Sequence, residues 1–209
     1  MAIRIEPFTL QGRHVRLEPL ELRHIDALAA ASAEDPDFYR WSAVPIGRHA
    51  VRLYVESALD AQLAGTALPL ATVRLADDRI IGSTRYFNLE WWSWPEGHRR
   101  RGRTLPDVCE IGYTWLAQSA IRTAINTEAK LLMLNQAFDS WGVVSVCLHT
   151  DERNARSRAA MERMGARFEG ILRSHRLATD GIPRNSARYS ITAAEWPEVK
   201  RSLAAKLRD

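Results

Sequence analysis

The segment that decides the fold is Thr150-Asp-Glu-Arg-Asn-Ala-Arg-Ser-Arg-Ala-Ala-Met-Glu-Arg-Met-Gly-Ala-Arg-Phe-Glu-Gly170, which comes just after the uninterrupted apolar run Val143 to Leu148. Such a run is typical of a strand covered on both faces in an α/β sheet. The charged stretch from about Arg153 to Met164 predicts a helix, and Gly165 suits its end. The segment therefore predicts an α/β fold with a strand–helix joint near its middle.

Two polar residues at this joint are candidates for binding. Asn154 and Ser157 are three apart, so they share one face of the helix start, where both could point at a ligand between neighbouring strands. The alternative is structural, because Asp151 and Asn154 are good N-caps, worth about 1 kcal/mol of helix stability.

The rest of the chain alternates strands and helices without a repeat or a dividing linker. Period-2 and period-3.6 patterns predict a strand over His14–Glu18, helices from about Glu21 to Ala33 and Arg48 to Leu63, strands over Leu68 to Leu75, Arg79 to Phe87 and Asp107 to Leu116, a helix from about Ile125 to Trp141, strands over Ala166 to Leu177 and Ser186 to Thr192, and a terminal helix from Ala194 to Leu207. In the long helix we expect Leu131, Leu134, Phe138 and Trp141 to be buried. This order predicts a mixed, mostly antiparallel sheet with a parallel pair near its middle and helices on both faces.

Composition limits the class of protein. The 209 residues are 46% hydrophobic and 26% charged, which is typical of a globular chain and excludes disorder and collagen. No apolar run reaches the roughly 18 residues of a membrane span, and the N-terminus lacks the apolar stretch of a signal peptide. We expect a single domain, residues 1–209, in the cytoplasm. Cys109 and Cys147 lie in apolar strands without metal-ligand spacing, so we expect reduced thiols and no metal.

The basic excess is local. The net charge is +4, and removing Arg99, Arg100, Arg101 and Arg103 brings it to zero. A single basic loop indicates one anionic contact or a solvated loop more than a nucleic-acid footprint. Just before it, Trp91, Trp92 and Trp94 lie within one irregular segment. Such an aromatic cluster marks either a pocket wall or a subunit interface, which leaves a homodimer open.

The strand–helix joint from Glu110 to Lys130 is a candidate phosphate site. Free amides at the start of a long helix, together with its dipole, favour a pyrophosphate, and Arg122, Thr123 and Thr127 could add donors. The alternative is an ordinary helix start capped by Thr123 or Asn126.

Together these segments resemble a known family. The order of elements, the strand Glu110-Ile-Gly-Tyr113, the helix start Thr127-Glu-Ala129 and the pattern Asn154-x-x-Ser157, Met164-Gly165-Ala166, Glu169-Gly170 resemble the GNAT (GCN5-related) acyl-CoA N-acyltransferases, in particular the RimJ/RimL-type ribosomal-protein N-acetyltransferases. The resemblance runs from about Gly12 to Trp196. It implies a GNAT fold whose central parallel strands splay apart around the cofactor.

Two positions depart from the family pattern. The phosphate loop usually carries Gln or Arg and then glycines, and Ile121, Ala124 and Asn126 stand there instead. Glycine lets the backbone approach a pyrophosphate closely, but Ala124 adds only a methyl group, so we expect coenzyme A to bind. Many relatives carry a tyrosine as the acid one turn beyond the Asn-x-x-Ser pair. Met161 stands there and cannot donate a proton.

The resemblance implies roles for the remaining candidates. The amides of Arg122, Thr123, Ala124, Ile125, Asn126 and Thr127 would hold the pyrophosphate and Asn154 the pantetheine, while the amide of Trp115 or Leu116 would be the oxyanion donor. Ser157 would be the acid near sulfur. Glu110 is the candidate base, with pairing to a neighbouring arginine as the alternative. His149 and His175 are further candidates, since imidazole titrates near neutral pH.

The acceptor is specified less closely. A pocket walled by Trp41, Trp91, Trp92 and Trp94 with arginines at its rim would suit an amine with an aromatic or anionic portion, or a donor such as succinyl-CoA in place of acetyl-CoA. We therefore expect acyl transfer from CoA to a primary amine of a small molecule or a protein N-terminus. The alternatives are a degenerate CoA-binding sensor or partner-binding protein, and an RNA or single-strand binder that uses Arg99 to Arg103.

Overall fold

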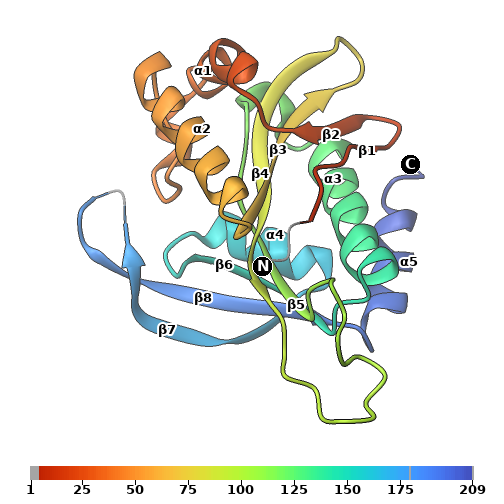
Figure 1. The fold of residues 1–209 in the computed structure, drawn as a ribbon. Helices are drawn as coiled ribbons and strands as arrows, with labels where there is room; N and C mark the ends of the chain where they lie inside the picture. The colour runs from red at the N-terminus through yellow and green to blue at the C-terminus, as the bar shows by residue number, and fades with distance from the viewer. Residues whose placement is uncertain (1–4, 179, 209) are drawn as a thin grey trace.

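A central twisted sheet organises the molecule (Figure 1). The structure is a computed structural model that describes residues 5–178 and 180–208. The strand order is β1-β2-β3-β4-β5-β6-β8-β7, and all neighbours are antiparallel except β5 and β6. This confirms the predicted sheet. The strands are β1 (Leu10–Gln11), β2 (Val15–Pro19), β3 (Ala67–Arg74), β4 (Arg79–Glu90), β5 (Val108–Leu116), β6 (Ser145–Asp151), β7 (Arg167–Leu177) and β8 (Pro183–Thr192).

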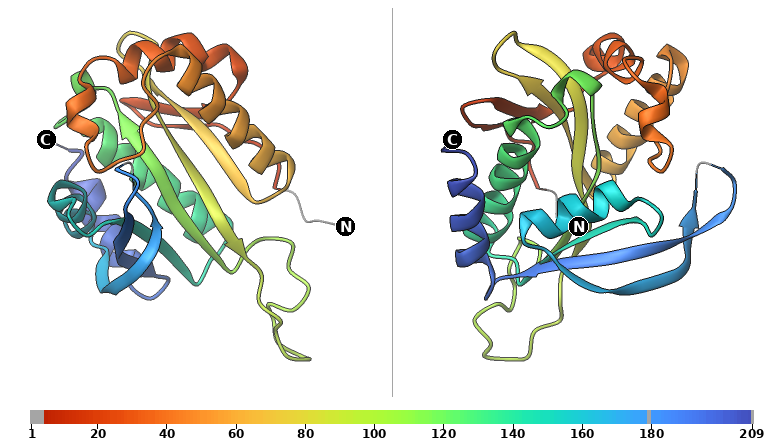
Figure 2. Two further views of the ribbon diagram at one scale, coloured as in Figure 1. Left: turned by 90° about the vertical axis from the view of Figure 1, so that its left-hand side faces the viewer. Right: turned by 180° about the vertical axis from the view of Figure 1, so that it is seen from behind.

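Helices cover both faces of this sheet, as the element order predicts. Two turns of 3-10 helix, η1 (Leu22–His24) and η2 (Pro36–Tyr39), flank α1 (Ile25–Ser32), and α2 (Arg48–Leu63) follows them. Beyond β5 come η3 (Gln118–Ala120), α3 (Ala124–Asn135), the π-helical turn η4 (Gln136–Ser140), α4 (Ala155–Met164) and α5 (Trp196–Ala205). Helices α1 and α2 lie on one side of the sheet and α3 and α5 on the other (Figure 1 and Figure 2).

Two local predictions need correction. The helix predicted from Ile125 to Trp141 is α-helical only to Asn135 and then widens into η4, and Leu131 is half-buried, whereas Met133 and Leu134 are fully buried. The predicted burial of Leu134, Phe138 and Trp141 is confirmed, whereas Leu131, which lies before η4, is covered only in part. In β5, Tyr113 has a φ of +51° and is 46% exposed, so the predicted alternation breaks there.

The start of α3 is tied to the first hairpin through Glu128. Its buried carboxylate accepts hydrogen bonds from the backbone amides of Arg13 (2.8 Å), His14 (2.7 Å) and Val15 (2.9 Å). Gly12 allows this approach, because a Cβ there would lie 2.3 Å from the carboxylate carbon of Glu128. A carboxylate that accepts several backbone amides is strongly held, so Glu128 fixes α3 against β1 and β2.

Strands β5 and β6 pair only at their beginnings. Their register runs from Val108 opposite Ser145 to Glu110 opposite Cys147. Beyond that point β5 stays with β4 as far as Leu116, and β6 stays with β8 as far as Asp151. The central parallel pair therefore parts after Glu110, which is the splay expected of the fold.

Candidate active site

The gap between β5 and β6 exposes backbone groups of β5. The amide of Ala117 donates to Ile81 O (2.7 Å) on the β4 side, whereas the carbonyl of Leu116 accepts from Tyr39 Oη (2.9 Å). Adjacent strand residues alternate between the two edges, and N–H and C=O of one residue share an edge. The amide of Leu116 therefore faces away from β4, toward the gap, and that of Trp115 faces β4. Of the two predicted oxyanion donors, only Leu116 has the required orientation.

The first turn of α3 lies near one end of the gap. Thr123 is the N-cap, and its Oγ1 accepts from the amide of Ile125 (3.3 Å). The structural alternative of a capped helix start is thus present for one amide. The other amides of the turn lack intrahelical partners, as at every α-helix start. Arg122 precedes the cap with a φ of +60°, a conformation that turns the chain sharply into the helix.

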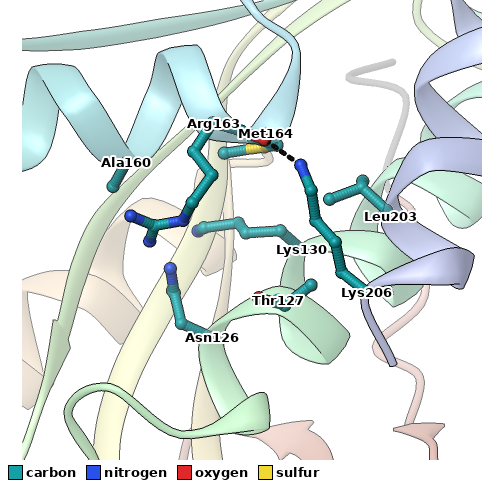
Figure 3. A pocket seen from close by; sticks show the side chains of 8 residues that line it. All are labelled: Asn126, Thr127, Lys130, Ala160, Arg163, Met164, Leu203 and Lys206. Atoms are coloured by element: carbon teal, nitrogen blue, oxygen red, sulfur yellow. Dashed lines mark hydrogen bonds between the residues drawn. The ribbon is translucent and has the colours of Figure 1, made fainter. Parts of the chain in front are cut away.

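A small, mostly cationic hollow adjoins this helix start (Figure 3). Its sides come from three helices and their ends: Asn126 and Thr127 from α3, Arg163 from α4, and Lys206 from the C-cap of α5. Lys206 donates to the backbone carbonyl of Arg163, which joins α5 to α4. Positive side chains beside a helix N-terminus favour an anionic group.

Lys130 also lines this hollow but is 5% exposed. Its Nζ donates to Thr114 Oγ1 (2.6 Å) and lies 3.4 Å from Thr84 Oγ1. Burial lowers the pKa of Lys130 to about 7, because water no longer solvates its charge. Sequence inspection missed this residue, since a lysine two positions after a glutamate in a helix ordinarily lies on a solvated face.

The start of α4 carries the polar pair predicted from sequence. Asn154 is buried and caps α4, because its Oδ1 accepts from the amide of Ser157 (3.0 Å). The structural role of Asn154 is therefore present, and its amide nitrogen, 3.5 Å from Ser42 Oγ, makes only a long contact. Ser157 is half-buried, and its hydroxyl makes no hydrogen bond within the described residues. Met161, one turn on, is buried in the core.

Glu110 lies where β5 and β6 part. Its buried carboxylate accepts from Asn88 Nδ2 (2.7 Å) and is 3.3 Å from the Arg176 guanidinium. Its other oxygen is 2.9 Å from His149 Nδ1, at ion-pair distance but without hydrogen-bond geometry. The arginine pairing considered as the alternative for Glu110 is thus present. The His175 ring is 5.1 Å from that of His149, and burial, Arg176 and His149 lower the pKa of His175.

The predicted tryptophan pocket does not assemble as one wall. The Trp41 ring lies under the guanidinium of Arg153 (4.1 Å), beside the start of α4. The indole N–H of Trp94 and the backbone amide of Trp92 instead donate to Asp107 Oδ2 at the base of the loop between β4 and β5. The indole of Trp92 donates to Glu90 Oε2, and that of Trp91 donates to Thr104 O within the loop. The loop extends away from the sheet (Figure 1). Indole N–H groups need acceptors, and the loop supplies its own.

The arginines of this loop are partly used within the fold. Arg100 and Arg103 donate to the carbonyl of Gly142, and Arg103 also donates to that of Trp141, just beyond η4. Cations commonly bind the unsatisfied carbonyls at a helix end. Arg99 and Arg101 do not share these contacts. Two of the four arginines therefore fasten the loop to the segment that follows η4.

Comparison with known proteins identifies the family. The model of the acetyltransferase (GNAT) domain family matches residues 14–167, well over half of the chain. The chain belongs to the GNAT acetyltransferases. No curated protein matches it.

Solved structures agree with this assignment. A GCN5-related N-acetyltransferase from Brucella melitensis superposes with a TM-score of 0.80 at 28% identity, over 97% of this chain and 86% of that one. A T. thermophilus protein assigned as an acetyltransferase has a TM-score of 0.79 at 32% identity, over 97% and 98%. Mycobacterium smegmatis RimJ, solved with CoA-disulfide, shares the fold at a TM-score of 0.78 and 21% identity, over 97% and 96%.

Two further features of this acetyltransferase bear on its chemistry. Among the described residues, no group of His, Cys, Asp or Glu is placed to hold a metal ion, and each helix there is too short or too polar to cross a bilayer. Arg85, in the middle of β4, is buried but lies outside every motif recognised in the sequence. A lone arginine within an apolar strand was its only signal.

Proposed function

We propose that this acetyltransferase moves an acyl group, in the simplest case acetyl, from acyl-CoA to a primary amine of a small molecule or a protein N-terminus by direct transfer. The observation that carries the proposal is the parting of β5 and β6 after Glu110, which turns the amide of Leu116 into the gap. The continuous sheet from β1 to β7 supports one catalytic domain over residues 1–209.

The residues present fit coenzyme A. The first turn of α3 and the cations beside it would hold the phosphates, and Asn154, at the opposite side of the gap, would contact the pantetheine arm. Bound acyl-CoA supplies an activated thioester carbonyl. The side chain of Thr123 caps only the amide of Ile125, and the side chain of Ala124 is only a methyl group. The remaining amides of the turn are therefore available to bind the phosphates.

The chain's own groups then divide the chemistry. As the amine nitrogen bonds to the acyl carbon and the carbon–sulfur bond breaks, the amide of Leu116 stabilises the negative charge on the carbonyl oxygen. Glu110 takes the proton that nitrogen loses, directly or through water, and the Ser157 hydroxyl delivers a proton to the departing sulfur. The contacts of Glu110 with Arg176 and Asn88 hold its carboxylate at the gap.

The test is thiol release from acetyl-CoA and, separately, succinyl-CoA against a panel of amines that includes ribosomal-protein N-terminal peptides. Release with at least one pair supports transfer. Binding of CoA without release for any pair would instead support a ligand sensor. A thermal shift measures the binding of CoA, since ligand at a hundred times its dissociation constant adds about 2.7 kcal/mol of stability.

The Ser157→Ala variant tests the acid. We expect turnover to fall about 10²-fold, because general acid catalysis contributes about that much, while the dissociation constant for CoA stays unchanged. Ser57→Ala is the matched control, since Ser57 is an exposed serine on α2. An unaltered turnover in the Ser157 variant would remove this residue from the mechanism.

A further inference from the structure

We propose that Arg85 binds an anionic group, a carboxylate or a phosphate, carried by the amine acceptor. This proposal rests on the proposed acyl transfer and names the class of acceptor for it. It follows from where Arg85 lies, from the partners it lacks and from the charges around it.

Arg85 is in contact with two aromatic rings. It is 6% exposed, and its guanidinium carbon is 4.0 Å from the ring centre of Tyr113 on β5 and 4.9 Å from that of Tyr54 on α2. The hydroxyl of Tyr54 is 3.1 Å from Ser83 Oγ, so it is not directed at Arg85. Tyr113 reaches over Arg85 from a backbone with a φ of +51°, an uncommon conformation for a bulky residue and one that clusters at functional sites.

The charge of Arg85 has no partner in the described part of the chain. The guanidinium makes no hydrogen bond or ion pair there, and its Nε is fully buried without an acceptor. Its terminal nitrogens Nη1 and Nη2 are not enclosed in the same way. Arginine stays protonated in proteins, and a buried unpaired charge is costly. Two free nitrogens in a planar fork match the oxygens of a carboxylate or phosphate.

The neighbouring charges favour an anion as well. The Phe87 ring lies 5.0 Å from that of Tyr113 and 5.4 Å from the Arg176 guanidinium carbon, so aromatic and cationic groups alternate across this face. The pKa of Arg184 is lowered by burial and then by repulsion from Arg176, so these two guanidinium groups lie within electrostatic reach of each other. Both also interact with Glu110, whose single negative charge is shared between them and His149.

The position of Arg85 places the anion beside the reacting amine. Arg85 and Phe87 are two apart on β4 and therefore share a face, and Phe87 is opposite Glu110 on β5. Two residues along a strand span about 7 Å. The anionic group and the amine of the acceptor are therefore separated by only a few bonds, as in a short ω-amino acid or aminoalkyl phosphate.

The experiment compares matched acceptors in wild type and variants. The probes are ω-amino carboxylates of two to six carbons, their neutral amides, and ω-aminoalkyl phosphates with the matching amino alcohols, all with acetyl-CoA and, separately, with succinyl-CoA. We expect wild-type kcat/KM to be at least 10²-fold higher for an anionic probe than for its neutral partner. Arg85→Gln should remove this preference and leave the neutral probes unchanged. Arg85→Lys should restore part of it, because lysine keeps the charge but not the fork.

Controls separate binding from folding. Arg79→Gln lies on the same strand, where Arg79 is exposed and 3.4 Å from Glu34, and it should keep the wild-type preference. Thermal shift by CoA verifies that each variant retains the fold and the cofactor site.

The outcomes distinguish this proposal from the proposed function. Transfer to neutral and anionic probes at equal kcat/KM would overturn the role of Arg85 and leave acyl transfer intact. A loss in Arg85→Gln confined to succinyl-CoA would also overturn it, because the anion would then belong to the donor. If no probe is acylated, calorimetric titration with the same probes in the presence of CoA tests whether Arg85 binds the anionic group. Binding of anionic probes that Arg85→Gln abolishes supports the site without the reaction, and absence of binding overturns the site.

Discussion

One buried cation lies on each face of strand β4, Lys130 from helix α3 on one face and Arg85 of β4 itself on the other, and their surroundings differ. On the α3 side, Lys130 donates to the hydroxyls of Thr114 and Thr84, and Glu128, two residues earlier, holds three backbone amides. On the α2 side, Arg85 has two aromatic rings beside it but no acceptor among the described residues. Thr84 and Arg85 are adjacent, so one strand serves both faces.

The two side chains differ in whether they can lose their charge when they are buried. A buried lysine can release its proton and become neutral, and the pKa of Lys130 at about 7 shows that cost. A guanidinium has no such route. Burial of Lys130 is therefore compensated without a ligand, whereas the guanidinium of Arg85 meets no anion among the described residues.

The largest expected effect is on the α3 face. Glu128→Gln replaces one carboxylate oxygen by an NH₂ group that meets backbone donors, so at least one of the amides of Arg13, His14 and Val15 loses its acceptor. We expect unfolding free energy to fall by about 2–4 kcal/mol, measured by urea denaturation. Glu198→Gln on exposed α5 is the control and should stay within about 0.5 kcal/mol. An equal loss in both variants would mean that Glu128 is not a structural anchor.

Lys130→Met is expected to change how stability depends on pH. Because the native pKa is lowered from 10.5 to about 7, the unfolded chain binds a proton that the native chain lacks between these values, so wild-type stability rises with pH across this window. Below pH 7 both states are protonated and the cost of burial is full. Thr84 and Thr114 remain paired at 2.7 Å without the lysine.

The variant should therefore be more stable than wild type by about 2 kcal/mol at pH 6, with the gain shrinking toward pH 10. Urea denaturation at pH 6, 8 and 9.5 measures this difference, with Lys200→Met, an exposed position, as the control. A gain that stays constant with pH would show that Lys130 does not titrate in this window.

The smallest effect concerns the ring over Arg85. Tyr113→Leu removes one of the two aromatic faces, and cation–π contacts are worth about 0.5–2 kcal/mol. We expect unfolding free energy to fall by about 1 kcal/mol, whereas Tyr113→Phe keeps the ring and should match wild type within about 0.5 kcal/mol. Equal losses in the two variants would assign the effect to the hydroxyl rather than to the ring. If the ring does not itself contact the ligand, an anionic probe should reduce the difference in unfolding free energy between Tyr113→Leu and wild type.

Much of the architecture could be predicted from the sequence, because periodicity reports local burial. The helix Arg48–Leu63 and the parallel pair near the middle of the sheet were both evident, since amphipathic spacing and apolar runs are local signals. Glu110 was recognised from its strand and its motif. Its partner Arg176, however, lies 66 residues later in the chain, and only the packing of β7 and β8 beside β6 brings the two together.

The tryptophans show which contacts a sequence pattern leaves undetermined. The cluster of indoles in the sequence indicated either a pocket wall or a subunit interface. Trp41 lies next to the Arg153 guanidinium, whereas the backbone amide of Trp92 and the indole of Trp94 donate to Asp107 in a separate loop. Composition indicates that rings gather, not which acceptors hold their N–H groups, since those acceptors depend on distant segments.

Periodicity and motif spacing thus settled the order of elements, the fold and the family, because each depends on neighbours within a few residues along the chain. The proposed site for the acceptor depends on the tertiary structure, because Arg85, Glu110 and Arg176 come near one another only when β4, β5 and β7 are assembled in one sheet. Burial is a property of the assembled sheet, and burial is what turns an ordinary arginine in a strand into a site that needs an anion.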